Sequence, residues 1–551
     1  MSWSLRSRCA VTGAVSALLL GSGASVANAE DGARAAEVPV PELAWEDCAT
    51  DVGGTEAGVQ CALAALPLDY DDPAGDQVHI AVARVPATDP AQRIGSLFFN
   101  FGGPGASTVD YLQAVGAGVF GSLNQQFDIV GFDPRGVGQS TPAIDCQADE
   151  EKQGVYSVPV PTPLDIDVDA YVAKAQSYVD ACLANNGAML EHVSTANVAR
   201  DMDALRAALG EEQLSYLGYS YGTFLGATYA SLFPDRYRAM TLDGPLDAEE
   251  YVNDPMSTLA AQTAAFEVAL GRFFEACAVD QAACSDFGGT DPWLAYDKLV
   301  AEAETTPIPA PGYTPDPRPV GGDEIRMATA SLLYAKQLWG VLGQALSEAA
   351  AGDATLLRAE IDEFFWGRQE DGSFSPSLSR YFTIGASEQQ YPTDDPQAFL
   401  DRGAESWASF PHAWWNSGYA EVAYGLWPAR DEDAYLGPFT APESSPTVLV
   451  VATTYDPATP YSGGVSLVDQ LGNARLLTME GDGHTAYGGN SPCVDSAVDS
   501  YLVSVTLPEA GTVCEQDVPF TAPEPAPAEG GAAASSLRVT TAVGALVGRR
   551  G

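Results

Sequence analysis

Residues 214–233 read Leu-Ser-Tyr-Leu-Gly-Tyr-Ser-Tyr-Gly-Thr-Phe-Leu-Gly-Ala-Thr-Tyr-Ala-Ser-Leu-Phe, and the fold prediction starts from this stretch. A short, mostly apolar run is followed by Gly218-Tyr-Ser220-Tyr-Gly222 and then by apolar residues at helical spacing, which predicts a strand, a sharp turn and a helix. A serine on such a turn needs glycine two residues to either side, because a Cβ there would collide with the crossing backbone. The stretch therefore predicts a nucleophile elbow at Ser220; the alternative is an ordinary strand–helix turn with a surface serine.

The backbone around this turn is suited to stabilising negative charge. The helix behind Ser220 directs free N–H groups and the positive end of its dipole towards the place where an oxyanion would form. A Gly-rich loop, residues 100–105, follows an apolar run at 95–99, and its backbone can approach a substrate oxygen closely. We expect the N–H groups of Tyr221 and Gly102 to form an oxyanion hole; for Gly102, a simple tight turn is the alternative.

Strands alternate with helices along the chain, which predicts an α/β fold with a largely parallel sheet. Strands are predicted at 77–85, 95–99, 127–133, 214–217, 238–243, 447–452 and 474–479, and a helix at 197–209 leads into the elbow strand. Between residues 247 and 440 the pattern is helical instead, with helices predicted at 259–274, 293–303, 324–350 and 354–366. We therefore expect a core of residues 30–246 and 441–516 with a mainly helical cap, 247–440, inserted into it.

The composition of the cap leaves its role in binding open. Its tryptophans are expected to form the cap core, and lining a substrate groove is the alternative; they are Trp366, Trp407, Trp414, Trp415 and Trp427. Glu249, Glu250 and Asp254 begin the cap, and other carboxylates are plentiful. The sequence does not select which of these carboxylates faces the site.

The two ends of the chain differ from the rest in composition. Two arginines precede an apolar stretch at 10–20, and small residues then lead to Ala27-Asn-Ala29. This pattern predicts a secretory signal peptide, residues 1–29, because the stretch is too short for a transmembrane anchor. The Pro- and Ala-rich segment 517–551 predicts a flexible tail. We expect a secreted, extracellular protein without stable membrane insertion; cell-surface association is the alternative location.

Cysteine usage fits an exported protein. Removal of the signal segment leaves eight of the nine cysteines, an even number that suggests disulfides. They fall as four neighbouring pairs, so we predict the disulfides Cys48–Cys61, Cys146–Cys182, Cys277–Cys284 and Cys493–Cys514. The lack of a C-x-x-C pair and the small number of histidines argue against zinc, and we expect no metal and no cofactor.

The chain is strongly acidic. It has 74 Asp and Glu against 26 Lys and Arg, a formal net charge of -48. Such a charge repels nucleic acid and anionic membrane surfaces, so neither is expected as a partner. We interpret the charge as a solubilising coat, and we expect a monomer.

A nucleophilic serine requires a histidine to accept its proton and a carboxylate to orient that histidine. Only four histidines are present, and three lie before the sheet core, before the elbow or within the cap: His79, His192 and His412. His484 follows the last predicted strand, so it is the candidate base. Asp456 follows the preceding strand, which is the place that chain order gives to the acid. Asp482 is the rival, but so close to His484 in sequence its side chain would have to fold back sharply.

A third Gly-rich loop, residues 133–140, follows the strand predicted at 127–133. Its Asp133 and Arg135 have the chemistry of catalytic residues. A paired Asp and Arg in such a loop more often hold the shape of the loop, so we expect a structural role for both.

Five motifs resemble those of the secreted tripeptidyl aminopeptidase family of actinobacteria, α/β-hydrolases related to prolyl aminopeptidases. They are Asn100-Phe-Gly-Gly-Pro-Gly105, Asp133-Pro-Arg-Gly-Val-Gly-Gln-Ser140, Gly218-Tyr-Ser-Tyr-Gly222, Asp456-Pro-Ala-Thr-Pro460 and Gly483-His-Thr-Ala-Tyr487. The resemblance covers about residues 44–515. It implies an α/β-hydrolase fold, Ser220, Asp456 and His484 as a catalytic triad, and release of short peptides, such as tripeptides, from free N-termini. The sequence departs from the family at Phe101, where proline is usual, and near Trp427, where a cysteine is often found.

Three functions therefore compete. The first is a secreted serine exopeptidase whose cap carboxylates bind the substrate ammonium group. The second is a carboxylesterase or lipase with the same triad, because the fold does not decide the leaving group. The third, a catalytically idle binding protein, is disfavoured by a complete triad, and a serine at the elbow disfavours the dehalogenases and epoxide hydrolases that use aspartate there.

Overall fold

The computed structural model describes residues 40–48, 58–369, 372–393 and 395–523. The predicted signal peptide, residues 1–29, lies outside the described residues, as does residue 524 onwards. None of the described helices is both long enough and apolar enough to cross a membrane.

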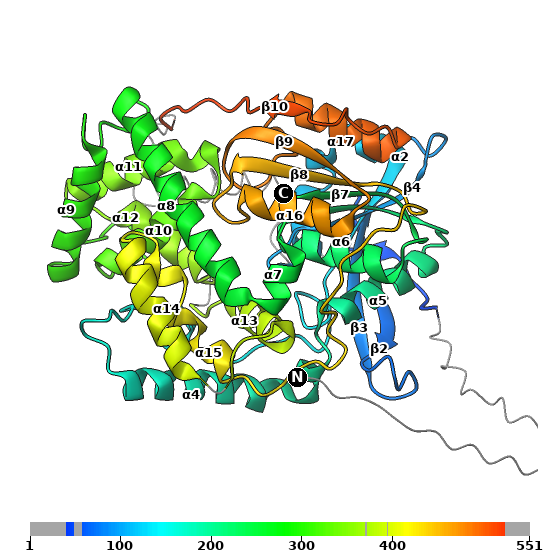
Figure 1. Cartoon of the computed structure of the whole chain (residues 1–551), viewed down its shortest axis with the longest axis horizontal. Coiled ribbons are helices and arrows are strands. Elements are labelled where there is room, and N and C mark those ends of the chain that lie inside the picture. Colours follow the sequence, from blue (N-terminus) through cyan, green and yellow to red (C-terminus); the bar gives the residue numbers. More distant parts are fainter. Residues whose placement is uncertain (1–39, 49–57, 370–371, 394, 524–551) are drawn as a thin grey trace, which may run out of the picture. The chain divides into compact units, whose positions relative to one another are not determined.

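The described strands form one ten-stranded sheet in the order β1-β2-β3-β5-β4-β6-β7-β8-β9-β10 (Figure 1). Pairing is antiparallel from β1 to β5 and parallel from β5 through β10, so the predicted mostly parallel sheet is confirmed. The strands are β1 (Glu46–Asp47), β2 (Gln60–Pro67), β3 (Gln77–Val85), β4 (Gly95–Asn100), β5 (Phe127–Phe132), β6 (Leu214–Tyr219), β7 (Tyr237–Asp243), β8 (Val448–Tyr455), β9 (Ala474–Asp482) and β10 (Val513–Glu515).

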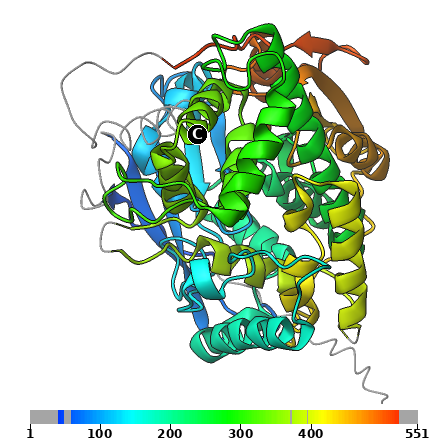
Figure 2. The same cartoon turned by 90° about the vertical axis from the view of Figure 1, so that its left-hand side faces the viewer.

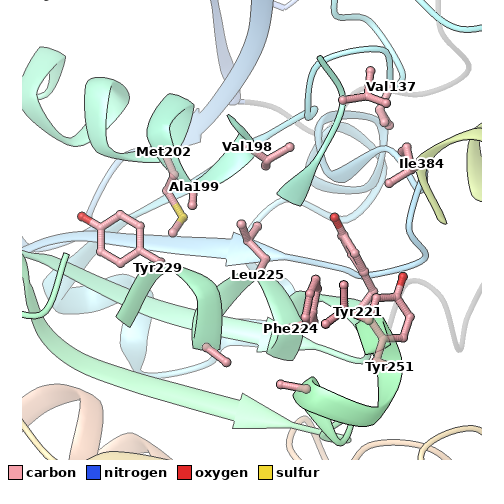
Figure 3. Close-up of a cluster of buried hydrophobic side chains, with 14 of the residues drawn as sticks. Val137, Val198, Ala199, Met202, Tyr221, Phe224, Leu225, Tyr229, Tyr251 and Ile384 are labelled. Carbon is pink, nitrogen blue, oxygen red and sulfur yellow. The ribbon is translucent and has the colours of Figure 1, made fainter. Parts of the chain in front are cut away.

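Helices cover both faces of the sheet, because apolar side chains alternate along its buried strands. In β4, Phe98 faces one layer and Leu97 and Phe99 face the other. The Phe98 side holds α5 (Thr195–Ala208), α6 (Tyr221–Leu232) and α16 (Tyr461–Leu471); the other side holds α1 (Thr108–Val115), α2 (Leu123–Gln126) and α17 (Pro492–Ser504). Figure 3 shows the first layer, where Met202 of α5 lies near Leu225 and Tyr229 of α6.

The cap lies between β7 and β8 and has its own buried cluster of side chains. Figure 2 looks onto its green and yellow helices. They are α7 (Ala248–Asn253), α8 (Pro255–Val279), α9 (Pro292–Thr305), α10 (Gly322–Leu333), η3 (Lys336–Leu338), α11 (Trp339–Ala350), α12 (Thr355–Glu360), η4 (Ile361–Phe365), α13 (Ser377–Glu388), α14 (Pro396–Ser409), η5 (Trp414–Asn416), η6 (Tyr419–Glu421) and α15 (Val422–Gly425). The helix predicted at 324–350 is broken between Leu333 and Trp339. Tyr334, which lies in the break, lines the cavity described below.

A second segment, before the elbow, also builds the cap. It contains α3 (Glu150–Gln153), α4 (Val168–Asn186) and η2 (Gly187–Glu191), between β5 and α5. Helix α4 packs against α15, and Tyr156 is part of the buried cluster of the cap. The cap is therefore not confined to residues 247–440. This contribution could not be predicted from the sequence, because the packing joins segments that lie far apart in the chain.

Residues 517–523 do not behave as the predicted flexible tail. The ring of Phe520 packs against Phe273 and Trp339 of the cap, with centroids 6.4 and 6.1 Å apart. The Asp517 N–H donates to the Asn490 carbonyl oxygen at 2.8 Å. Figure 1 shows this segment running from β10 towards α11. One aromatic anchor in a Pro-rich stretch thus moves the tail boundary beyond residue 517.

Four disulfides join the cysteines in the neighbouring pairs predicted from the sequence: Cys48–Cys61, Cys146–Cys182, Cys277–Cys284 and Cys493–Cys514. The second ties the loop after β5 to α4, and the fourth ties α17 to β10. Each closes a short or medium loop, which restricts the unfolded chain and so favours the folded state.

Arg135 is fully buried and has the predicted structural role, but its ion pair is with Asp201 and not with Asp133. Its Nε and Nη2 donate to the two carboxylate oxygens of Asp201 at 2.8 and 2.7 Å. The remaining donors bind the carbonyl oxygens of Pro67, Leu68 and His192 at 2.7 to 3.1 Å. One guanidinium therefore joins the end of β2, the loop after β5 and the start of α5.

We expect Arg135→Ala to lower the free energy of unfolding by about 3–5 kcal/mol, because it leaves the Asp201 carboxylate buried and unpaired. Urea unfolding of the purified protein measures the loss. Arg200→Ala is the control, since Arg200 is partly exposed and lies 3.5 Å from Asp433; its expected cost is about 1 kcal/mol or less. Equal losses in the two variants would contradict the structural role of Arg135.

Candidate active site

Ser220 stands at the turn between β6 and α6, in the setting that the sequence predicts. Its backbone has φ 55° and ψ −123°, a strained conformation for a residue with a side chain. A Cβ added at Gly218 would lie 2.4 Å from the Gly222 carbonyl oxygen, and one at Gly222 would lie 2.9 Å from the Asn100 carbonyl oxygen. Both glycines are thus required sterically, and Ser220 lines a cavity beneath the cap.

Asp456 and His484 lie together at the carboxyl ends of β8 and β9. The His484 Nδ1 is 3.0 and 2.9 Å from the two carboxylate oxygens of Asp456. Asp456 is buried and also accepts hydrogen bonds from the backbone N–H groups of Ala458 and Thr459 at 2.9 and 2.8 Å. A carboxylate so fixed keeps the proton of His484 on Nδ1 and leaves Nε2 able to accept one.

The Ser220–His484 hydrogen bond is not formed. Within the described residues, the buried Nε2 of His484 has no hydrogen-bond partner. Both side chains line the same cavity. Such a contact is often long without substrate and shortens when substrate binds.

Asp482, the rival acid, is used elsewhere. It is 4% exposed, forms an ion pair with Arg272 of α8, and accepts a hydrogen bond from Lys336 Nζ at 2.7 Å. These contacts fasten the cap to the core beside His484. The backbone N–H of His484 makes a further link, since it donates to the Tyr334 carbonyl oxygen at 2.7 Å.

Two positioning residues were missed by the sequence analysis. Thr459 donates its hydroxyl to Asp456 Oδ2 at 3.0 Å and lies 3.2 Å from His484 Nδ1. Asp243, fully buried at the end of β7, accepts hydrogen bonds from the N–H groups of Ala486 and Tyr487 in the His484 loop. Burial raises the pKa of Asp243 to about 7, although these two N–H groups lower it. Position at the carboxyl end of a core strand was the available signal for Asp243, as it was for Asp456.

The predicted oxyanion donors need one correction. Tyr221 is the first residue of α6, so its N–H has no acceptor within the helix. The Gly102 N–H instead donates to the Asn100 side chain at 3.1 Å. A Cβ at Gly102 would lie 2.7 Å from the Tyr219 carbonyl oxygen, so glycine is needed there for close packing against the elbow. Gly103, the next residue, is the one that lines the cavity.

The cavity has a volume of about 540 Å³ and lies between the elbow and the cap. Its walls are mainly aromatic and aliphatic, with contributions from Tyr156, Tyr334, Phe364, Tyr381 and Trp415. Trp415 is the only predicted tryptophan among its described lining residues, and Glu249, Glu250 and Asp254 are not among them. Asp254 caps α8 by accepting from the Ser257 N–H. The volume falls in the range of small-ligand sites.

The other three histidines do not line the cavity. His79 is exposed on β3, and His192 follows η2. His412, before η5, lies between two cap carboxylates, with Nδ1 2.5 Å from Glu267 and Nε2 2.9 Å from Asp297. Burial lowers the pKa of His412, but the hydrogen bonds and charges of both carboxylates outweigh it, so the pKa is raised above 6.5.

This geometry predicts a pH-dependent contribution of His412 to stability. Because the pKa is raised on folding, the contribution is complete below pH 6.5 and is lost as pH rises through the folded value. Its size is on the order of 1 kcal/mol or less, since Asp297 is largely in contact with water. Urea unfolding between pH 5.5 and 8.5 is the measurement: the difference between wild type and His412→Gln should shrink with rising pH. A constant difference would contradict it.

One cluster of carboxylates has the spacing of a metal site, but arginines neutralise it. Its members are Glu151, Asp316 and Asp362. They are paired with Arg318, Arg358 and Arg368. We interpret the cluster as an ion-pair network between the two cap segments.

Comparison with known proteins agrees with this geometry. The family model described as "alpha/beta hydrolase fold" matches residues 97–277, and that described as "TAP-like protein" matches residues 418–514. The chain is 37% identical to "Serine protease Hip1" of Mycobacterium tuberculosis, over 83% of this chain and 87% of the relative. It is 36% identical to "Carboxylesterase B" of the same species (87% and 91%) and 32% identical to "Tripeptidyl aminopeptidase" of Streptomyces lividans (90% and 89%). The chain therefore belongs to the tripeptidyl aminopeptidase family of α/β-hydrolases, and it is a serine hydrolase.

Proposed function

We propose that the chain is a serine exopeptidase that releases short peptides, such as tripeptides, from free N-termini, with Ser220, Asp456 and His484 as its triad. The observation that carries the proposal is the meeting of the Ser220 elbow and the Asp456–His484 pair at one cap-covered cavity. Two of the relatives are named as a protease and a tripeptidyl aminopeptidase, which supports peptide substrates.

In the proposed reaction, Ser220 Oγ attacks the scissile carbonyl carbon while His484 Nε2 accepts the hydroxyl proton. The N–H groups of Tyr221 and Gly103 stabilise the resulting oxyanion. His484 then gives the proton to the leaving amine, the C–N bond breaks, and an ester on Ser220 remains. Water, deprotonated by His484, attacks this ester. The bond between the acyl carbon and Ser220 Oγ then breaks, His484 returns the proton to Oγ, and the released peptide leaves as a carboxylic acid.

We also propose that the protein is secreted. The sequence of residues 1–29 supports export. Four disulfides fit an oxidising compartment outside the cytoplasm.

A carboxylesterase is the second candidate. The apolar walls of the cavity favour it, because they would also accept acyl chains. The relative named "Carboxylesterase B" favours it as well. The same triad would cleave an ester by the steps given above.

One comparison of substrates tests both candidates. The mature protein is assayed with a tripeptide anilide that has a free amine, with its N-acetylated form, and with a short-chain ester. The exopeptidase predicts turnover of the free-amine anilide and little turnover of the acetylated one. Ester turnover without peptide turnover would overturn it in favour of the carboxylesterase.

A further inference from the structure

Glu360 is the only carboxylate among the described residues that line the cavity. The described lining residues include no Lys, Arg or Asp, and His484 is the only other ionisable group among them apart from tyrosines. The Glu360 carboxylate therefore requires an explanation, because burying an isolated carboxylate in an apolar cavity costs free energy unless it has a partner.

The position of Glu360 is well defined by its surroundings. It ends α12 at the point where the chain enters the π-helical turn η4, and such turns are frequent at functional sites. Helix α12 packs against α10, which carries Ser331 (Figure 1). The Ser331 hydroxyl donates to Glu360 Oε1 at 2.5 Å.

The second carboxylate oxygen of Glu360 is unpartnered. The residue is 2% exposed, and Oε2 has no hydrogen-bond partner within the described part of the chain. The nearest cation in sequence, Arg358, is occupied by Glu324 and Asp362. A buried acceptor that its own protein leaves unsatisfied, on the wall of the reaction cavity, marks a place for a donor on the substrate.

We propose that Glu360 binds the α-ammonium group of the substrate N-terminus, and that its distance from Ser220 sets how many residues are released. This inference rests on the exopeptidase function proposed above. An ammonium is the donor that best matches a carboxylate with one free oxygen, because it supplies charge and N–H groups together. With the amine bound at Glu360 and the scissile carbonyl at Ser220, only peptides whose N-terminal portion spans the distance between these two residues fit.

The ionisation of Glu360 agrees with such a role. Burial raises the pKa of Glu360 to about 7; the Ser331 hydrogen bond lowers it and the charge of Glu363 raises it. An ammonium beside Oε2 favours the carboxylate form, so binding of the amine and ionisation of Glu360 assist one another.

The test measures binding in the Ser220→Ala protein, which does not turn over its ligand. Calorimetry compares a tripeptide amide with a free amine and no basic side chain against its N-acetylated form. We expect the free-amine form to bind about 10- to 100-fold more tightly, and Glu360→Gln to remove most of this difference. Glu363→Gln, which removes a carboxylate one turn away that does not line the cavity, should preserve it.

Turnover by the protein that retains Ser220 gives a second readout. Glu360→Gln should raise KM for the free-amine tripeptide anilide much more than it lowers kcat, and it should flatten the preference among di-, tri- and tetrapeptide anilides. Glu360→Asp keeps the charge on a shorter side chain and should give an intermediate KM with an altered length preference.

Each other outcome is decisive. Full discrimination retained in Glu360→Gln would overturn this inference and leave the exopeptidase function standing. Absence of discrimination in the parent protein would overturn both. Glu360-dependent binding of an N-acetylated peptide that contains lysine, without preference for a free N-terminus, would assign Glu360 to a side-chain pocket instead.

Discussion

Replacement of Ser220 by alanine is expected to lower kcat by about a million-fold, the loss found when a serine nucleophile is removed from a triad. Alanine keeps the Cβ and therefore adds no strain at φ 55°. The substrate should still bind, because the cavity walls are unchanged. The measurement is single-turnover hydrolysis of the preferred anilide or ester, with binding followed separately.

Ser231→Ala is the matched control for this variant. Ser231 lies in the last turn of the same helix and does not line the cavity. Its removal should leave kcat unchanged. Activity that persists in Ser220→Ala, after contaminating enzymes have been excluded, would show that the elbow serine is not the nucleophile.

Asp456→Asn is expected to lower kcat by about 10⁴-fold. The Asn amide would donate towards His484 Nδ1, and the imidazole would then carry its proton on Nε2, where it could no longer accept the Ser220 proton. The loss should fall mainly on kcat, because Asp456 is buried behind His484.

Asp482→Asn distinguishes the role of Asp482 from that of Asp456. Asp482 contacts Arg272 and Lys336 rather than His484, so this change should weaken the attachment of the cap and lower stability with little effect on kcat. The two variants are compared by steady-state kinetics and by urea unfolding. A larger loss of kcat in Asp482→Asn than in Asp456→Asn would reverse the assignment.

Several features followed from the sequence because they depend on neighbours in the chain. The glycines around Ser220 are a local steric requirement, and their effect can be read from five residues. The order of strands and the carboxyl ends at which loops emerge placed Asp456 and His484 at one edge of the sheet, where the structure brings them within 2.9 Å. Cysteines that are neighbours in the order of cysteines along the chain form the four disulfides, with sequence separations of 7 to 36 residues.

Other features depended on contacts between distant segments. Gly102 and Gly103 are equivalent in sequence terms. They differ in the tertiary structure, where the Gly102 N–H donates to Asn100 and Gly103 lines the cavity. Thr459 lies 3.2 Å from His484 Nδ1, and Asp243 accepts a hydrogen bond from the Tyr487 N–H, so both residues contact a loop in a distant part of the chain. The share of residues 150–191 in the cap was hidden for the same reason.

The parallel sheet, the elbow and the candidate triad could thus be predicted from the sequence, because they follow from the order of the strands along the chain and from local sterics. Which of the many cap carboxylates lines the cavity depends on packing between distant segments and could not be predicted from the sequence. No local sequence pattern distinguishes Glu360 from Glu249, Glu250 and Asp254. Glu360 differs because α12 packs against α10, which places its carboxylate on the cavity wall. Within the described residues, one oxygen of that carboxylate has no hydrogen-bond partner.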